Sequence, residues 1–212
     1  MGQTAARSPK QHRSRRTLQR ITRAALELIG QHGVEGTSVG AIVRRAGSSV
    51  GSFYARFDGK NDLLLYLDER IWETVELQWS EALAGGLSDR PIDQLVRGLA
   101  RLYTDLDLVH RGARDAIGRA LRGPWAGPSD AELRIRARVR EDSERLLLAK
   151  RSVIVHSDPA LAVETVCRTL ESAASHFEPV FLEDLCTALV RHLVGDSSSS
   201  SASSVEFFDI WN

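Results

Sequence analysis

Apolar residues recur at spacings of three and four through most of the chain, which predicts helices with one buried face. The first such helix runs from Thr17 to about His32, and Gly33 ends it. A long helix is predicted from about Asp58, its expected N-cap, to about Leu83. The later helices are predicted at about 91–107, 114–121, 129–151, 159–176 and 179–194. No stretch alternates convincingly between apolar and polar residues, so the pattern predicts an all-α fold.

Residues 38–57 predict two further, shorter helices joined by a tight turn. Ser38 is a suitable N-cap for the first helix, and Gly47 ends it. Ser48 and Ser49 can cap the second helix, which is predicted from about Val50 to Phe57. Two short helices with a glycine-containing turn form a helix-turn-helix.

The second short helix has two different faces. Phe53 and Phe57 stand four residues apart, so they share a face and are predicted to bury against the first helix. Gly51 removes a side chain where a helix backbone would approach a phosphate or a base edge. The remaining face is small and polar, which suits entry into a major groove of DNA.

The spacing and residue types of this stretch resemble the N-terminal domain of the tetracycline-repressor (TetR/AcrR) family. The resemblance covers about residues 17–65 and is carried by Thr37-Ser38, Ala46-Gly47-Ser48-Ser49, Gly51-Ser52-Phe53-Tyr54, Phe57, Lys60 and Leu63. It implies a three-helix DNA-binding domain joined by a long helix to a larger helical domain for ligand binding and dimerisation. Val50, Ala55 and Arg56 depart from residues frequent in the family, so the resemblance does not carry over an operator sequence.

Candidate DNA contacts follow from this reading. They are Thr37, Ser38, Arg44, Arg45, Ser48, Ser49, Val50, Gly51, Ser52, Tyr54, Arg56 and Lys60. The hydroxyls and the Lys60 ammonium suit phosphate oxygens. Ser52 and Arg56 are predicted to meet base edges, with a backbone contact as the alternative for Arg56. Arg44 and Arg45 are phosphate contacts or part of a solvated face.

The net charge of zero hides an asymmetry along the chain. Residues 1–60 hold 11 Lys and Arg against 3 Asp and Glu, whereas the remainder holds 17 against 25. The basic part is predicted to face nucleic acid, because clustered cations gain affinity for a polyanion by counterion release. No apolar run is long enough to span a membrane and no secretory signal is present, which predicts a cytoplasmic protein.

The sequence offers no constellation for catalysis, and no metal site or cofactor is predicted. It has no phosphate-binding glycine loop and no nucleophile motif, and its six histidines are scattered. Cys167 and Cys186 are too few for a disulfide framework and are predicted to be buried free thiols.

Four segments are predicted along the chain. They are a basic flexible arm (1–16), a helix-turn-helix domain (17–60), a helical effector-binding and dimerisation domain (61–195) and a Ser-rich flexible tail (196–212). The arm either lies along DNA or is a solubilising tail. The aromatic end of the tail is either an unstructured terminus or a docking peptide. The helix over 129–151 is rich in Arg and Glu and is predicted to be mostly solvated.

The last two helices carry more apolar surface than one partner helix would cover. This excess predicts a homodimer through a four-helix bundle, as the resemblance also implies; burial within one subunit is the alternative. The predicted interface residues are Val166, Leu170, Leu182, Leu185, Leu189 and Leu193.

A small-molecule effector is predicted in the larger domain. Aromatic and polar residues that could line its pocket are Trp72, Trp79, Tyr103, His110 and Trp125, although aromatics at helical spacing are more often core. We therefore interpret the sequence as a homodimeric, ligand-responsive regulator, preferably a repressor, of a palindromic operator in double-stranded DNA. The alternatives are a dimeric ligand-binding or interaction module without DNA binding and, less favoured, a helical enzyme.

Overall fold

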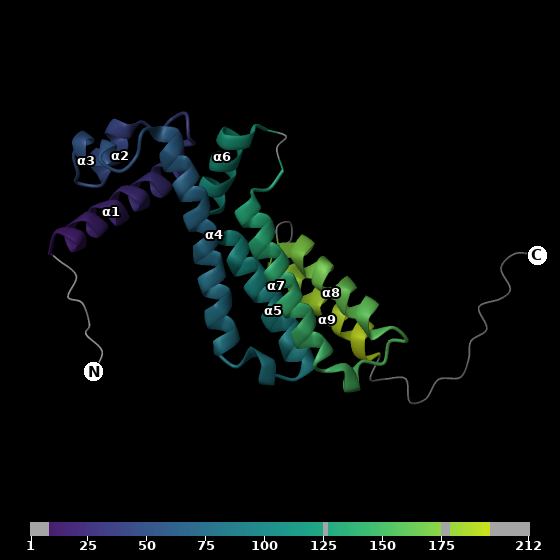
Figure 1. Ribbon diagram of the computed structural model, residues 1–212. Helices are drawn as coiled ribbons and strands as arrows, with labels where there is room; N and C mark the ends of the chain where they lie inside the picture. Colours follow the sequence, from purple (N-terminus) through teal and green to yellow (C-terminus); the bar gives the residue numbers. More distant parts are fainter. Residues whose placement is uncertain (1–8, 125–126, 175–178, 196–212) are drawn as a thin grey trace, which may run out of the picture. The chain divides into compact units, whose positions relative to one another are not determined.

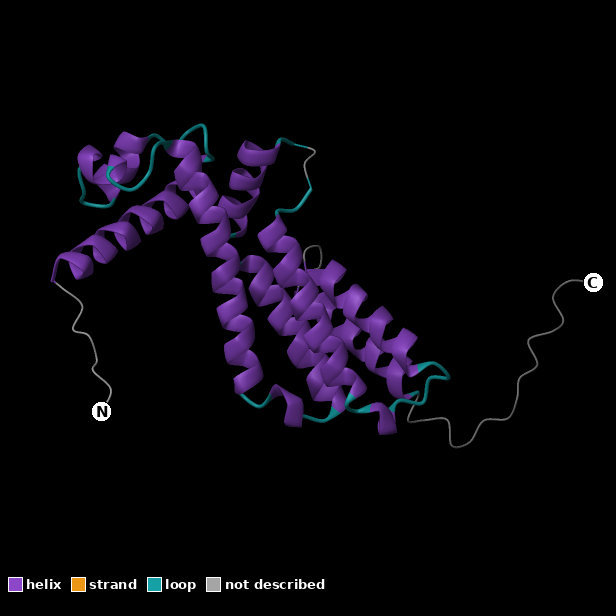
Figure 2. Cartoon of the chain, viewed as in Figure 1, coloured by secondary structure: helices purple, strands orange, loops and turns teal. Residues whose placement is uncertain are grey.

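The computed structural model describes residues 9–124, 127–174 and 179–195, and the regular structure in these ranges is helical throughout (Figure 1; Figure 2). In chain order the elements are α1 (Pro9–His32), α2 (Val39–Arg45), α3 (Val50–Tyr54), α4 (Lys60–Ala84), η1 (Leu87–Asp89), α5 (Ile92–Leu108), α6 (Arg111–Arg122), α7 (Asp130–Leu148), η2 (Arg151–Val153), α8 (Pro159–Ala174) and α9 (Pro179–Val194). The predicted all-α fold is confirmed. None of these helices combines the length and apolarity that a bilayer span requires.

The chain divides into two compact units. The N-terminal unit comprises residues 1–84 and 105–139, and the C-terminal unit comprises residues 85–104 and 140–212. The chain therefore crosses from one unit to the other at the end of α4, within α5 and again within α7. These units are defined by contacts within the fold, whereas the predicted domains 17–60 and 61–195 are defined by function. The limits of the domains therefore stay a prediction.

The N-terminal unit is built on α1. Helix α2 packs on α1 and α3 packs on α2, and α6 packs on both α1 and α4 (Figure 1). The core of the unit joins all of these helices; its largest fully buried members include Ile21, Ile29, Ile42, Phe53, Leu63, Leu64, Leu67, Ile71 and Ile117. The helix-turn-helix is thus held by α1 beneath it and, through the same core, by α4 and α6.

The predicted start of the first helix at Thr17 was wrong. Helix α1 begins at Pro9, so residues 9–16 of the predicted arm are helical. Proline is well suited to a first helical turn, and no helix breaker follows it. The apolar periodicity begins only at Leu18, which is why the pattern did not reveal the first turns.

Several helix caps match the expected chemistry. The Ser38 and Ser49 hydroxyls accept backbone N–H bonds at the starts of α2 and α3, both at 3.1 Å. Asp158 does the same for α8, and Ser129 accepts from Glu132 at the start of α7.

The expected cap of the long helix was wrong. Helix α4 starts at Lys60, and Asp58 does not cap it; instead the Asp58 N–H donates to the Asp62 carboxylate at 3.1 Å. The second short helix also differs from its predicted length. It ends at Tyr54 rather than Phe57, because the chain turns at Ala55 while Phe57 still reaches the core.

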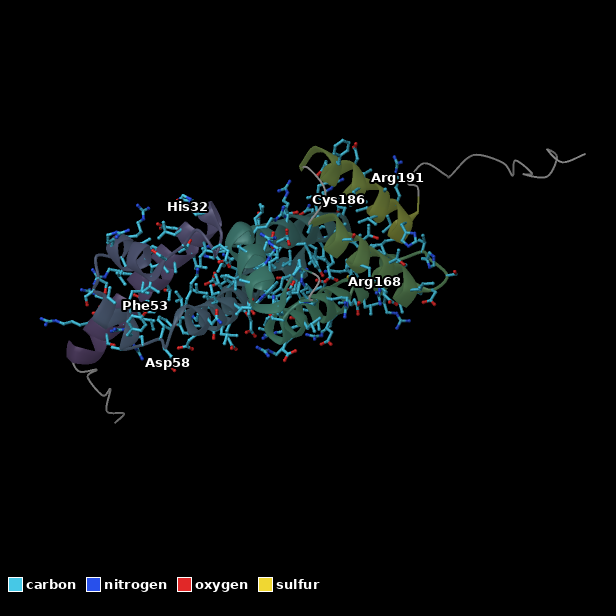
Figure 3. The ribbon with its side chains drawn as sticks, turned by 90° about the horizontal axis from the view of Figure 1, so that it is seen from above. His32, Phe53, Asp58, Arg168, Cys186 and Arg191 are labelled. Atoms are coloured by element: carbon cyan, nitrogen blue, oxygen red, sulfur yellow. The ribbon has the colours of Figure 1, made fainter. Side chains whose placement is uncertain are left out.

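In the C-terminal unit, α8 and α9 pack side by side (Figure 1). Figure 3 marks Arg168 on α8, and Cys186 and Arg191 on α9. Cys167 and Cys186 are both buried free thiols, as predicted. Burial raises the pKa of the Cys167 thiol to about 12, which keeps it protonated and unreactive near neutral pH.

Most residues of α7 are exposed or half-buried, in line with the prediction that this helix is mostly solvated. A stripe along the helix is buried at Ile135, Val139, Asp142, Ser143 and Leu147. Only three of these residues are apolar, so the abundant Arg and Glu of the remaining positions concealed the stripe. Within the C-terminal unit the Tyr103 hydroxyl donates to the Ser143 hydroxyl at 3.2 Å, and burial raises the pKa of Tyr103.

Candidate nucleic-acid interface

The turn between α2 and α3 is fixed by its backbone. Gly47 has φ +56°, a left-handed conformation that glycine adopts without steric cost. The Ser48 N–H donates to the Val43 carbonyl at 2.9 Å, and the Gly47 N–H donates to the Arg44 carbonyl at 3.1 Å. This pair of bonds is a Schellman motif, which ends α2 and sets the direction of α3.

Helix α3 is anchored by aromatic side chains. Phe53 and Phe57 are buried, with their ring centroids 5.4 Å apart, and Phe57 lies 5.5 Å from the Tyr66 ring of α4. Figure 3 labels Phe53 in this part of the ribbon. The prediction that both phenylalanines belong to the core is confirmed. A five-residue helix has little stability of its own, so this anchoring determines its orientation.

The opposite side of α3 faces solvent. Val50 is 50% exposed and Tyr54 is 55% exposed, and Ser49 and Gly51 are exposed as well. Ser52 is half-buried, and its hydroxyl accepts from the Ser49 hydroxyl at 3.0 Å. The exposed face therefore combines a small backbone profile, hydroxyl groups and one aromatic ring, which fits the surface of a major groove.

Two of the predicted contact residues bond the loop after α1: Thr37 bonds within this loop, and Lys60 ties the start of α4 to it. Thr37 is almost fully buried, and its hydroxyl donates to the Gly33 carbonyl at 2.8 Å. The Lys60 ammonium donates to the Val34 carbonyl of the same loop. Both side chains therefore have a structural role here, and their contact with phosphate stays a prediction.

Two predicted arginines also have partners within the chain. The Arg56 guanidinium donates to the Ser52 carbonyl at 2.6 Å and to the Ser14 hydroxyl at 3.0 Å, which links the end of α3 to α1. Arg45 donates through Nε and Nη2 to one oxygen of Glu27, at 3.0 and 2.9 Å. The neighbouring Arg44 is exposed, as are Ser38 and Ser49, whereas Ser48 is half-buried.

The sequence analysis placed Arg13 and Arg16 in the basic arm, but it did not single out Arg20 and Arg23 or the face of α1 that all four share. Arg13, Arg16, Arg20 and Arg23 are exposed, and their spacing of three, four and three puts them on one helix face. The recurrence of arginine at helical spacing was the available signal. It was overlooked because the first four turns were divided between an arm and a helix.

The predicted effector residues do not form one described cluster. Trp72, Trp79 and His110 belong to the N-terminal unit, Tyr103 belongs to the C-terminal unit, and Trp125 lies outside the described residues. Trp72 and Trp79 are buried, whereas His110 is exposed and has a left-handed backbone with φ +48°.

Trp72 is surrounded by charge within the N-terminal unit. The guanidinium carbons of Arg114 and Arg136 lie 5.6 and 5.5 Å from its ring centroid, within the range of cation–π interaction. Arg114 also bonds the buried Asp107 carboxylate at 3.1 Å. Trp72 Nε1, Arg114 Nη1 and one oxygen of Asp68 are buried without a hydrogen-bond partner among the described residues.

The predicted dimer residues divide into two groups. Val166, Leu170, Leu189 and Leu193 are buried within the single chain. Leu182 and Leu185 remain half-exposed. Two residues outside the prediction, Leu161 and Phe181, present large apolar side chains from α8 and α9 with 54% and 58% exposure.

Comparisons with known proteins agree with this geometry. Residues 21–67, which contain α2 and α3, match the family model described as bacterial regulatory proteins, tetR family. The HTH-type transcriptional regulator AcrR of Shigella flexneri is 41% identical over 71 residues, which is 34% of this chain and 31% of the relative. The match thus spans about a third of the relative's length.

Solved structures resemble the chain over most of its length. Regulatory protein TetR from Rhodobacter sphaeroides is 22% identical with a TM-score of 0.56, over 84% of this chain and 99% of that one. The transcriptional regulator FadR from Bacillus subtilis, solved with stearoyl-CoA, is 17% identical with a TM-score of 0.55, over the same shares. At these identities the structures show a common fold. Since the sequence match lies over the helix-turn-helix itself, residues 21–67 form a helix-turn-helix region similar to that of the tetR family of bacterial regulatory proteins.

Proposed function

We propose that the protein is a homodimeric transcriptional repressor that binds a palindromic operator and is released from it by a small molecule. The observation that carries the proposal is α3, which Phe53 anchors in the core while Tyr54 and its neighbours stay exposed. In a dimer the two copies of α3, held about 34 Å apart, would enter successive major grooves. The match of residues 21–67 to a family of bacterial regulatory proteins supports DNA binding as the function of this surface.

Selection of duplexes from a random pool tests the proposal directly. We expect an inverted repeat whose half-sites are separated by about one helical turn of DNA, and an affinity that falls steeply with salt. Tyr54→Ala should lower affinity for the selected duplex, with a scrambled duplex as the control. If no sequence is selected over the scrambled duplex, the alternative of a dimeric module without DNA binding is favoured. Turnover of a bound small molecule would instead support an enzyme.

The same assay distinguishes two possible roles of Arg56, a base contact and a structural contact with α1. If Arg56 reads a base edge, Arg56→Ala relaxes the preference at one base position. If Arg56 instead holds α1 through Ser14, the variant weakens binding to every sequence by a similar factor, because the whole exposed side of α3 is displaced. Lys60→Ala should likewise weaken all sequences, and a reduced salt dependence would identify a phosphate contact.

We place the dimer contact on the outward sides of α8 and α9. Leu182 and Leu185 are half-exposed there, and Leu161 and Phe181 are exposed. Exposed apolar side chains of this size favour burial against a partner subunit. Val166, Leu170, Leu189 and Leu193 would support this surface from beneath, because they are already buried within the subunit.

Sedimentation of charge variants tests the dimer. Leu185→Glu and Phe181→Glu should yield monomers that keep the helical content of the wild type, because a carboxylate cannot be buried unpaired in the contact. Leu77→Glu is a matched control, since Leu77 is a 59% exposed leucine on α4, a helix that contributes no residue to the proposed contact. Dimers that persist in both α8–α9 variants would place the contact elsewhere.

The effector is proposed to be a molecule with an apolar body and an anionic or strongly accepting group. The support comes from Trp72 Nε1 and Arg114 Nη1, two buried donors without an acceptor among the described residues. Leaving such donors unsatisfied is costly, so a ligand that supplies an acceptor would gain affinity. FadR of Bacillus subtilis, which shares the fold, was solved with stearoyl-CoA, and this anionic thioester is therefore a rational first probe.

Helix α6 offers a path from such a ligand to DNA. It carries Arg114, and it packs on α1 and α4 within the N-terminal unit. Its Gly112 lies against Gly30 of α1 so closely that an added methyl group would stand 3.4 Å from the Gly30 carbonyl oxygen. A ligand that favours a different position of α6 would thus displace α1 and the helix-turn-helix. Release requires that the ligand bind the two states with different affinities.

A DNA-release titration tests this part of the proposal. Stearoyl-CoA should raise the apparent Kd for the selected duplex, and shorter acyl-CoA thioesters should do so at higher concentration. Trp72→Phe keeps an aromatic ring but removes the indole N–H, so it should retain DNA binding and lose part of the response. An unchanged response in Trp72→Phe would remove this indole from the effector site.

A further inference from the structure

Helix α1 presents an arginine face beside the helix-turn-helix, made of Arg13, Arg16, Arg20 and Arg23. At about 100° per residue these four positions fall within an arc of about 80°. All four are exposed, and among the described residues their guanidinium groups have no hydrogen-bond or ion-pair partner. Four like charges on one rigid face repel one another, so the arrangement is more stable when an anion is bound.

The arginine face lies on the same side of the N-terminal unit as the turn between α2 and α3. The guanidinium of Arg20 is 3.6 Å from the position that a Cβ on Gly47 would occupy. The next position on the face is Glu27, which bonds Arg45 of α2. The face is therefore continuous with the predicted DNA contacts, and the Glu27–Arg45 pair marks its end.

Packing makes this face rigid. On its buried side α1 contributes Ile21, Ala24 and Ala25 to the core that also holds Phe53. Near its start, Ser14 accepts from Arg56 at the end of α3. Arg13 and Arg23 are separated by about 15 Å along the helix axis, at about 1.5 Å per residue. Several phosphates of a DNA duplex lie within that length.

We propose that the arginine face of α1 binds the phosphate backbone of duplex DNA beyond the major groove that α3 enters. This inference rests on the proposed function and enlarges its footprint on DNA. The guanidinium groups would bond phosphate oxygens in charge-assisted pairs. Because phosphates carry no sequence information, the face would add affinity and orientation without changing which bases are read.

The salt dependence of duplex binding tests the inference. Arg13→Gln/Arg20→Gln should lower the slope of log K against log salt by about 1.8, since each lost phosphate contact removes about 0.9. Affinity should fall by the same factor for the selected and the scrambled duplex. Arg15→Gln is the matched control, because Arg15 is exposed on the same helix but lies about 140° around the axis from Arg20. Gln keeps helix propensity and Arg→Gln leaves the buried side of α1 intact, so the fold should persist.

A trimmed duplex provides an independent measurement on the wild type. Removing the base pairs outside the half-sites should weaken wild-type binding to the level of Arg13→Gln/Arg20→Gln, and the double variant should be insensitive to trimming. Phosphate ethylation interference on the wild type should reveal the same outer phosphates without any variant.

The outcomes separate the two proposals. A wild type that binds no duplex in a salt-dependent manner contradicts the proposed function. A wild type that binds its selected duplex, together with a double variant of unchanged slope, overturns the arginine face alone. A loss confined to one base position would show base contacts and would also contradict the phosphate assignment.

Discussion

The helix-turn-helix and the Trp72 cluster, which comprises Trp72, Arg114, Arg136 and Asp107, both contain arginine–carboxylate ion pairs. The pair is exposed in the first region and buried in the second. Around α2 and α3 an apolar base lies beneath exposed polar groups, and the Arg45–Glu27 pair is 59% and 39% exposed. Around Trp72 the polar groups are inside, and the Arg114–Asp107 pair is only 10% and 7% exposed. In a surface that binds phosphates and bases, the polar groups can be solvated by water when no DNA is bound. A cluster that buries them depends on each partner, which makes it sensitive to a ligand or a substitution.

The largest effect is expected when the buried aromatic anchor beneath the exposed side of α3 is removed. Phe53→Ala should lower the free energy of unfolding by about 3–5 kcal/mol, because it removes a fully buried ring and leaves a cavity. DNA binding should be lost as α3 loses its anchor. Urea unfolding followed by circular dichroism measures the first effect. Tyr54→Ala, which truncates the adjacent exposed ring, should leave stability within about 0.5 kcal/mol of the wild type.

The sequence predicted the turn between α2 and α3 and the two faces of α3 well, because the determinants of both are local. The cap at Ser49, the left-handed Gly47 and the four-residue spacing of Phe53 and Phe57 act within one or two turns of helix. Tertiary packing decided what the pattern missed. The start of α1 at Pro9 has no apolar signal, and the burial of Ser143 and Asp142 on α7 contradicts their polarity.

The Trp72 cluster shows most clearly what could not be predicted from the sequence alone. Trp72 was predicted as a pocket residue, but its arginine neighbours come from α6 and α7, distant in sequence from α4. A single sequence does not reveal which of many arginines are buried. Similarly, the partners of Arg56 and Lys60, at Ser14 and Val34, join segments whose approach depends on the fold. For these residues the chemical type was readable from the sequence, but their partners were determined by the fold.

The buried pair provides the second prediction. Asp107→Asn should lower the free energy of unfolding by about 3 kcal/mol, because it removes the carboxylate that compensates Arg114 and Arg111 in a poorly solvated site. The matched control is Asp115→Asn. Asp115 is also a partner of Arg114, at 3.6 Å, but it is 48% exposed, and its loss should cost less than about 1 kcal/mol. Equal costs for the two variants would contradict the contrast between buried and exposed pairs.

A smaller effect is expected at the start of α3. Ser49→Ala removes the hydroxyl that accepts the Ser52 N–H, so it should destabilise this helix by about 1 kcal/mol. Hydrogen exchange of the Ser52 amide should accelerate about fivefold, which is the equivalent of that free energy. Ser48→Ala is the neighbouring control, because Ser49 rather than Ser48 is the cap. If both variants exchange alike, the cap does not determine the stability of α3.

The smallest change in stability is expected for the exposed pair, where the two environments can be compared most directly. Glu27→Gln breaks the Arg45–Glu27 ion pair, yet it should alter the free energy of unfolding by no more than about 0.5 kcal/mol, since water solvates both groups. Its effect on DNA binding should be opposite in sign to that of a lost arginine. Release of Arg45 and loss of a negative charge beside the arginine face should increase the salt slope by up to about 0.9. Calorimetry and a salt titration on the same preparation measure both quantities. A variant that is strongly destabilised, or that binds duplex more weakly, would show that Glu27 supports the reading surface structurally rather than limiting its charge.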